Sequence, residues 1–140
     1  MGKTLYAGLS TRTDAAGIAA LSEIVRPIGF DVVHAKLKDC LHLKTAATLA
    51  GPGGAGSMTL IYNRESVDPA QFAGLEAVPV HEDEPAAANC LRLDDRLILP
   101  AGNPRTAELL RNRGLSVVEV DVSELQKAEA GVTCMSLIAD

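Results

Sequence analysis

The sequence predicts a mixed α/β or α+β protein built from repeated strand and helix units. Short runs rich in Val, Ile and Leu are typical of buried strands, and they alternate with segments whose apolar residues are spaced three or four apart, as in helices. A strand pair, a helix and a further strand recur about every forty to fifty residues. No residue pattern recurs with this rhythm. The 140 residues, 47% of them hydrophobic, are predicted to form one domain over residues 1–140.

The first unit begins with a predicted strand at residues 4–9. A turn follows, in which Thr13 or Asp14 is suited to be the N-cap of a helix. The apolar residues of that helix have helical spacing: Ile18, Leu21, Ile24 and Val25. Pro27 ends the helix, and residues 30–35 are predicted as the second strand.

The middle of the chain is predicted to hold three strands and a short helix. Large apolar and polar residues alternate at 41–45, which favours a strand. A Gly-rich turn at 51–56 leads to a strand at 58–62. A short helix at 69–74 then precedes an apolar run at 77–80.

The following unit is predicted to consist of a hairpin, a helix and a further strand. Strands at 90–93 and 96–99 flank Asp94 and Asp95, which suit a tight turn. A helix from Pro104 to Leu110 is predicted next, and residues 116–120 return as a strand.

The C-terminal segment carries the residue that is most informative about function. Ser123 is predicted to cap a short helix, which Gly131 ends before an apolar strand that contains Cys134. A cysteine is reactive only where its thiolate is stabilised and accessible. Cys40 and Cys90 lie in apolar contexts and are predicted to be small buried hydrophobic residues.

Composition excludes several classes of function. The net charge of −5 argues against a nucleic-acid surface, which needs clustered Lys and Arg. No apolar run reaches the length of a membrane span, and no signal segment opens the chain. The three cysteines form no CxxC pair and indicate reduced thiols. We therefore expect a cytoplasmic protein that binds neither membrane nor nucleic acid.

Four motifs occur in a characteristic order: Gly-Leu-Ser-Thr-Arg-Thr at 8–13, Leu-His-Leu-Lys-Thr at 41–45, Ala-Ala-Asn-Cys at 87–90 and Gly-Val-Thr-Cys-Met-Ser at 131–136. Together they resemble the dimethylarginine dimethylaminohydrolases of the guanidino-group-modifying superfamily. The resemblance covers essentially all 140 residues. It implies the pentein fold, a β/α propeller, present here as a partial ring of ββαβ-like units.

The resemblance also implies the roles of four residues. Cys134 would attack the guanidinium carbon of an Nω-methylated arginine to give a thiouronium intermediate, and His42 would protonate the departing amine and then activate water. Arg12 would pair with the substrate's α-carboxylate, and the backbone carbonyl of Ala128 would hold its α-amino group. The ligand would be a small guanidino amino acid. We expect no cofactor and no metal, because Cys134 and His42 are only two potential zinc ligands.

A sibling family, the arginine deiminases, is an alternative. It usually carries an aspartate where this chain has Lys44, and a Gly-rich run with Arg directly before the cysteine, which this chain lacks. Both differences favour the dimethylaminohydrolases.

The acidic part of the site is expected to lie elsewhere. Family enzymes are nearly twice this length, and the resemblance implies that their guanidinium-binding carboxylates precede the strand that begins here at Thr4. The candidates within this chain are Asp39, Glu82, Asp83 and Glu84, which no motif supports. A non-catalytic binding module and a self-associating half-ring stay open as alternatives. We expect a homo-oligomer or a complementary chain, because a partial ring exposes sheet edges and apolar surface.

Overall fold

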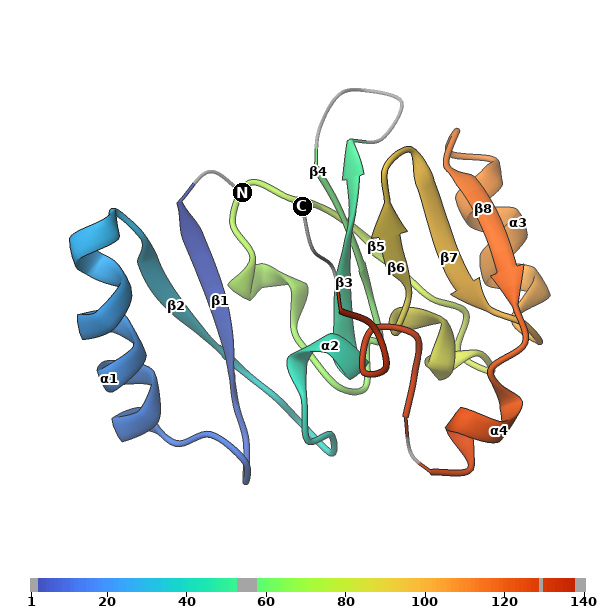
Figure 1. Cartoon of the computed structure of the whole chain (residues 1–140). Coiled ribbons are helices and arrows are strands. Elements are labelled where there is room, and N and C mark those ends of the chain that lie inside the picture. The colour runs from blue at the N-terminus through green and yellow to red at the C-terminus, as the bar shows by residue number, and fades with distance from the viewer. Residues whose placement is uncertain (1–2, 53–57, 129, 138–140) are drawn as a thin grey trace.

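The computed structural model describes residues 3–52, 58–128 and 130–137, which form three sheets with helices packed beside them (Figure 1). The elements in chain order are β1 (Thr4–Leu9), α1 (Ala15–Val25), η1 (Arg26–Ile28), β2 (Asp31–Lys36), α2 (Leu43–Ala46), β3 (Ala47–Pro52), β4 (Met58–Tyr62), η2 (Pro69–Gln71), β5 (Glu76–Pro79), η3 (Pro85–Ala88), β6 (Leu91–Leu93), β7 (Arg96–Pro100), α3 (Pro104–Arg111), β8 (Ser116–Val120) and α4 (Ser123–Gln126), where η denotes a 3₁₀ helix.

Two of the sheets repeat one topology. β3 pairs antiparallel with β4, which pairs parallel with β5, and β6, β7 and β8 are arranged in the same way. In the first sheet β1 and β2 form a parallel pair joined through α1. The predicted unit of strand pair, helix and strand is therefore confirmed, and so is the predicted fold class.

Local sequence explains several element boundaries. The Asp14 carboxylate accepts a hydrogen bond of 2.8 Å from the backbone N–H of Gly17, so Asp14 caps α1 as predicted. Asp94, at φ 53°, occupies the left-handed region in the tight turn between β6 and β7. Pro104 begins α3, where its fixed φ suits the first helical position.

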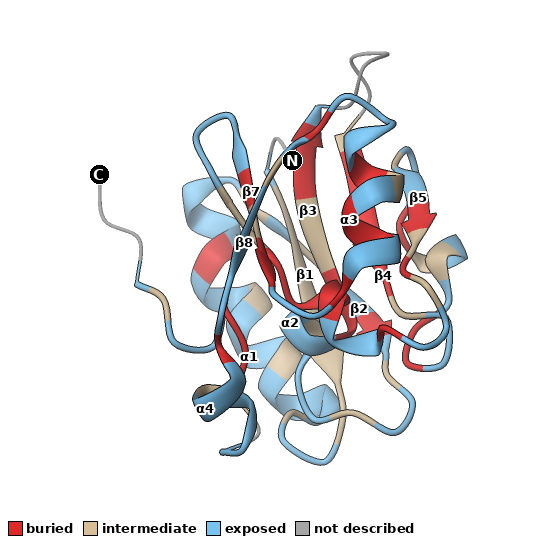
Figure 2. Cartoon of the chain, turned by 90° about the vertical axis from the view of Figure 1, so that its right-hand side faces the viewer, coloured by how far each residue is buried: buried red, intermediate tan, exposed pale blue. Residues whose placement is uncertain are grey.

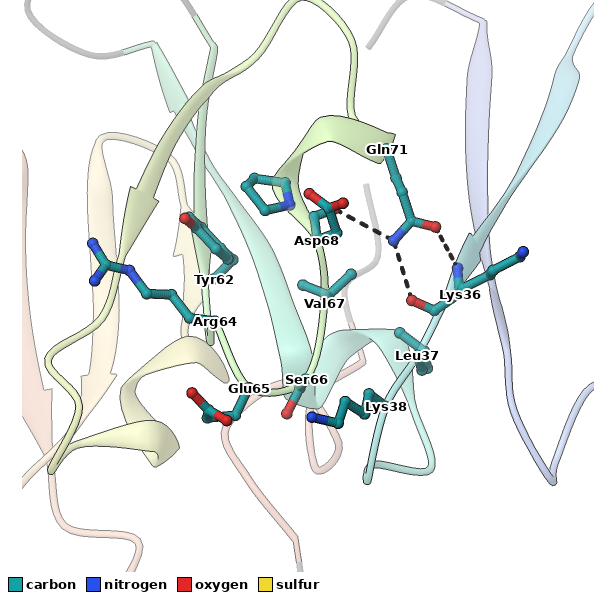
Figure 3. A pocket seen from close by; sticks show the side chains of 11 residues that line it. Lys36, Leu37, Lys38, Tyr62, Arg64, Glu65, Ser66, Val67, Asp68 and Gln71 are labelled. Atoms are coloured by element: carbon teal, nitrogen blue, oxygen red, sulfur yellow. Dashed lines mark hydrogen bonds between the residues drawn. The ribbon is translucent and has the colours of Figure 1, made fainter.

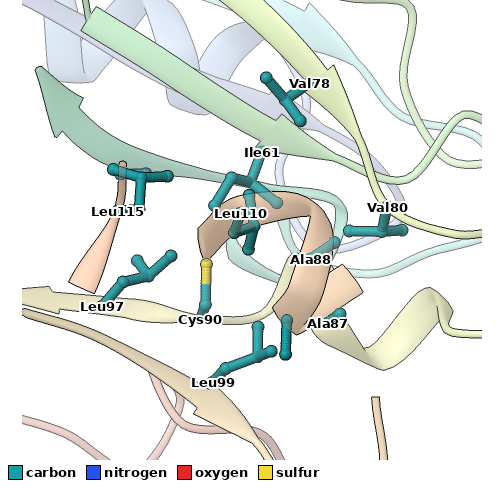
Figure 4. Close-up of a cluster of buried hydrophobic side chains, with 12 residues drawn as sticks. Ile61, Val78, Val80, Ala87, Ala88, Cys90, Leu97, Leu99, Leu110 and Leu115 are labelled. Carbon is teal, nitrogen blue, oxygen red and sulfur yellow. The ribbon is translucent and has the colours of Figure 1, made fainter. Parts of the chain in front are cut away.

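Two hydrophobic clusters hold the sheets together. One packs residues of the second and third sheets against α3 and includes Ile61, Leu97, Leu99, Leu110 and Cys90 (Figure 4). The other joins the first and second sheets around Leu60, Tyr62 and Phe72. Figure 2 shows buried residues on β3, β4 and the inner side of α3, whereas most of α1 is exposed. The second and third sheets therefore share the larger of the two buried clusters.

The predicted strand at 41–45 is wrong, because this segment enters a helix. His42 is the N-cap residue of α2, and the strand begins only at Ala47. Leu43, Ala46 and Ala47 are the residues that pack into the core, at helical spacings of three and four. Five alternating residues are too few to separate the two periods.

The predicted strand around Cys134 is also wrong. Residues 132–135 form turns, in which the backbone N–H of Met135 donates to the carbonyl of Gly131 over 3.3 Å. Ser123 is not a cap but the first residue of α4, and the Asp121 carboxylate accepts from its N–H over 2.9 Å. The predicted helix at 69–74 is shorter, at Pro69–Gln71. Of the predicted Gly-rich turn, residues 51 and 52 end β3, and residues 53–56 lie outside the described residues.

Candidate active site

The site is centred on the turn that holds Cys134, which is exposed and lies close to α2 (Figure 1, red turn). Partial burial would raise the pKa of this thiol. Hydrogen bonds with the Asn89 side chain, the Gly131 backbone and the Thr133 side chain outweigh that effect, and with the positive charge of Lys44 they lower the pKa. A stabilised and accessible thiolate is what a nucleophilic cysteine requires.

Asn89 is a site residue whose importance the sequence did not indicate. It is only 5% exposed, and its amide NH₂ lies 3.4 Å from the Cys134 sulfur. The place of Asn89 before a strand favours a turn or backbone-capping role. The available clue in the sequence is a polar residue within the apolar run Ala-Ala-Asn-Cys. In the structure this run is buried, and a buried amide needs hydrogen-bond partners.

His42 lies at the entrance to α2, two residues before Lys44, and its side chain is exposed. Its backbone carbonyl accepts from the Thr45 N–H over 3.0 Å and from the Cys40 thiol over 3.8 Å. Among the described residues no hydrogen bond joins the His42 imidazole to the Cys134 thiol. Lys44 lines the same cavity as Thr133 and Ser136, so the structure brings the His42 segment to the Cys134 turn.

Arg12 lies in the turn between β1 and α1, and it is exposed. The hydroxyl of Ser10 accepts from the Arg12 backbone N–H over 3.1 Å and donates to the Leu41 carbonyl over 2.8 Å. Ser10 therefore ties the Arg12 turn to the residue before His42. Within the described ranges, no ion pair or side-chain hydrogen bond is found for the Arg12 guanidinium, and its role at the substrate's carboxylate stays a prediction.

Ala128 follows α4 and is exposed, and its N–H donates to the Leu125 carbonyl over 3.0 Å. The proposed role of the Ala128 carbonyl stays a prediction.

The structure gives two of the acidic candidates a structural task. The Glu84 carboxylate accepts from the backbone N–H groups of Arg105 and Thr106, at 3.0 and 2.7 Å, and so holds the N-terminus of α3. Asp83 forms an ion pair of 2.8 Å with Arg105. Among the described residues, no group of three or more His, Cys, Asp and Glu side chains could hold a metal ion.

Two of the cavities formed by the described residues open on the surface. One of about 690 Å³ lies beside the Cys134 turn and is lined mainly by apolar residues, including Leu5, Tyr6, Leu49, Leu60 and Leu75. The other, of about 670 Å³, lies between the end of β2 and the loop after β4 (Figure 3). There the Gln71 amide bonds both the N–H and the carbonyl of Lys36, at 2.7 and 3.2 Å. None of the four predicted site residues lines either cavity, but their chain neighbours Leu43, Lys44 and Thr133 line the first.

No family model matches the sequence. The chain is 36% identical over 137 residues to the N(G),N(G)-dimethylarginine dimethylaminohydrolase of Pseudomonas aeruginosa, covering 98% of this chain and 52% of that protein. The Streptomyces coelicolor enzyme of the same name is 38% identical over 138 residues, covering 98% and 50%.

This chain is homologous to the dimethylarginine dimethylaminohydrolases. The resemblance predicted from the four motifs is thus confirmed. A solved structure of the Pseudomonas aeruginosa enzyme, a cysteine-to-serine mutant in complex with citrulline, superposes with a TM-score of 0.84 at 34% identity. It covers 96% of this chain and 51% of that one. The chain therefore spans about half the length of the dimethylaminohydrolases that it matches. Within the described residues, no helix is long and apolar enough to cross a membrane.

Proposed function

We propose that this chain hydrolyses Nω-methylated arginine to citrulline and methylamine or dimethylamine. The observation that carries the proposal is the exposed Cys134 thiol, whose pKa is lowered by its hydrogen bonds and by Lys44. The chain's sequence identity of 36–38% to two dimethylarginine dimethylaminohydrolases supports the choice of substrate. The chain spans about half the length of those two proteins, so we transfer the activity of the whole enzyme to this chain only as part of this proposal.

The proposed reaction uses the residues of this chain in two steps. The Cys134 thiolate forms a bond to the guanidinium carbon, and the C–N bond to the methylated nitrogen breaks as His42 supplies a proton to the leaving amine. Water, deprotonated by His42, then adds to the thiouronium carbon, and the C–S bond breaks to release citrulline and the thiolate. Arg12 pairs with the substrate's α-carboxylate, and the carbonyl of Ala128 accepts from its α-ammonium group.

Citrulline formation tests the proposal. Purified chain is incubated with Nω,Nω-dimethylarginine, with Nω-monomethylarginine and with arginine, and citrulline is measured for the natural sequence and for Cys134→Ser. We expect turnover of the methylated substrates that Cys134→Ser abolishes. Cys90→Ser is the matched control, because that thiol is buried in the core, and it should keep the activity. Turnover of arginine alone would instead support a deiminase-like activity.

A non-catalytic binding module is the second candidate function. The specific observation in its favour is that the described carboxylates Asp83 and Glu84 are occupied by Arg105 and by the N-terminus of α3. Binding of dimethylarginine without citrulline formation, lost in Arg12→Ala, would support the module.

We also propose that a second copy or a complementary chain supplies the guanidinium-binding carboxylates. Two observations support this: β1 pairs only with β2 among the described strands, and the apolar cavity of about 690 Å³ opens beside it. Sedimentation at micromolar concentration should show a species larger than one chain. A strict monomer would count against the proposal.

A further inference from the structure

We propose that Asn89 is a positioning residue for Cys134: it holds the nucleophile's turn and stabilises the thiolate by donating a hydrogen bond to sulfur. The inference rests on the proposed function for its catalytic meaning, but its geometry stands independently. Asn89 and Cys134 are 45 residues apart in the chain, and the amide NH₂ lies 3.4 Å from the sulfur.

The other end of the same amide holds the backbone beside the cysteine. The Asn89 side-chain oxygen accepts from the Thr133 N–H over 3.0 Å and from the Thr133 hydroxyl over 2.6 Å. Since a backbone N–H can only donate, the oxygen must face Thr133, and the NH₂ group must therefore face Cys134. One side chain thus places the turn and presents a donor to the thiolate.

Asn89 is itself held by the buried core of the second and third sheets. It follows Ala87 and Ala88, both fully buried, and its N–H donates to the Ala86 carbonyl over 3.1 Å. The hydroxyl of Thr48 in β3 donates to the Ala88 carbonyl over 2.8 Å. The Asn89 amide therefore links the Cys134 turn to the core of the second and third sheets.

Gly131 leaves room for this arrangement. A β-carbon at Gly131 would overlap the Asn89 amide, so the residue three positions before Cys134 must lack a side chain. The close approach lets the Gly131 backbone also form a hydrogen bond with the Cys134 thiol, which contributes to lowering its pKa. The Gly of the Gly-Val-Thr-Cys motif is thereby explained by the Asn of the Ala-Ala-Asn-Cys motif.

Asn89→Asp separates the two roles of the amide. The carboxylate keeps an acceptor for Thr133, but it replaces the donor facing Cys134 with a negatively charged oxygen, which disfavours the thiolate. The rate of Cys134 alkylation by iodoacetamide is followed from pH 5 to 10 by peptide mass spectrometry. We expect the titration midpoint to move to higher pH and the rate at pH 7 to fall by about three- to tenfold.

An unchanged pH profile in a folded Asn89→Asp variant would overturn the inference, because a carboxylate in contact with the sulfur must disfavour the thiolate. A new carboxylate repels the thiolate whatever the amide did before, so the neutral variant Gly131→Ala is measured in parallel. Circular dichroism establishes folding. If Asn89→Asp does not fold, Gly131→Ala decides, because its methyl group displaces the amide while residues 84–90 stay intact. Its profile should move in the same direction, and an unchanged profile would overturn the inference. Alkylation of Cys134 needs no substrate. Absence of citrulline formation would therefore contradict the proposed function without affecting the test of Asn89.

Discussion

Two thiols on either side of Asn89 show how strongly local surroundings decide cysteine chemistry. Cys90 follows Asn89 in the chain and is fully buried, and burial raises its pKa to about 12 despite hydrogen bonds with Thr48 and with its own backbone. Cys134 approaches Asn89 through space from an exposed turn, and its pKa is lowered. The two groups are chemically identical, so the difference lies in burial and in the number of donors.

A third acidic group separates those two causes. Glu84 is only 7% exposed, and its burial would raise its pKa, yet hydrogen bonds from Thr106 and Arg105 lower it. Hydrogen bonds outweigh burial at Glu84, as they do at Cys134. In both groups the donors aimed at the charged form decide the direction of the pKa shift.

The largest expected effect is a difference in thiol reactivity. At pH 8 a thiol with a pKa of about 12 is thiolate in roughly one molecule in ten thousand. We expect iodoacetamide to modify Cys134 at least about a thousandfold faster than Cys90 in the native protein. Time points are quenched and the two peptides are quantified by mass spectrometry.

The control for this measurement is the same reaction in denaturant, where both thiols should react at similar rates. Cys134→Ser removes the fast phase and should leave the slow labelling of Cys90 unchanged. Equal native rates for the two cysteines would contradict the comparison.

Sequence patterns predicted the fold better than they predicted these surroundings. β1, β4 and β8 lie within a residue of their predicted bounds, because each is a compact apolar run. The pattern at residues 41–45 predicts a strand, but the chain forms α2 there. Leu43 packs into the core from a helical turn, and five residues are too few to reveal that spacing. Local pattern predicts local structure, and it fails where tertiary packing chooses between two periods.

The motifs predict which residues carry the reaction, and those roles stay predictions; the motifs do not predict what holds Cys134 in place. Motifs singled out Cys134 and His42, yet the contact that holds Cys134 comes from Asn89, 45 residues earlier. No local periodicity encodes such a contact. It depends on how the third sheet packs beside the C-terminal turn, which only the folded chain shows.

An intermediate effect is expected from Glu84→Gln, measured by urea unfolding. At pH 7 the variant should lose about 1–3 kcal/mol of unfolding free energy, because a carboxylate that accepts two backbone N–H groups is replaced by a neutral amide. The folded-state pKa of Glu84 lies below its ordinary value of 4.5. Its stabilisation is therefore complete above pH 4.5 and is lost as the pH falls through the folded-state value.

The deficit of Glu84→Gln should accordingly shrink when the unfolding is repeated under more acidic conditions. Glu82→Gln is the matched control, because Glu82 is an exposed acid two residues away, and its change should stay within about 0.5 kcal/mol. A deficit that is equal at both pH values would show that Glu84 acts by packing rather than by charge.

The smallest expected effect separates charge from hydrogen bonding at Cys134. Lys44 is exposed, and its charge is the weakest of the influences that lower the pKa of the Cys134 thiol. Lys44→Met should therefore slow Cys134 alkylation at pH 7 by only about twofold, and 1 M salt should remove the difference, because salt screens exposed charges. Arg113→Met, which removes an exposed cation in the turn after α3, should change nothing. Asn89→Asp should keep most of its effect in 1 M salt, since its oxygen contacts the sulfur directly. If salt abolished both effects equally, the effect of Asn89→Asp would come from the screened charge of the new carboxylate and not from the lost donor.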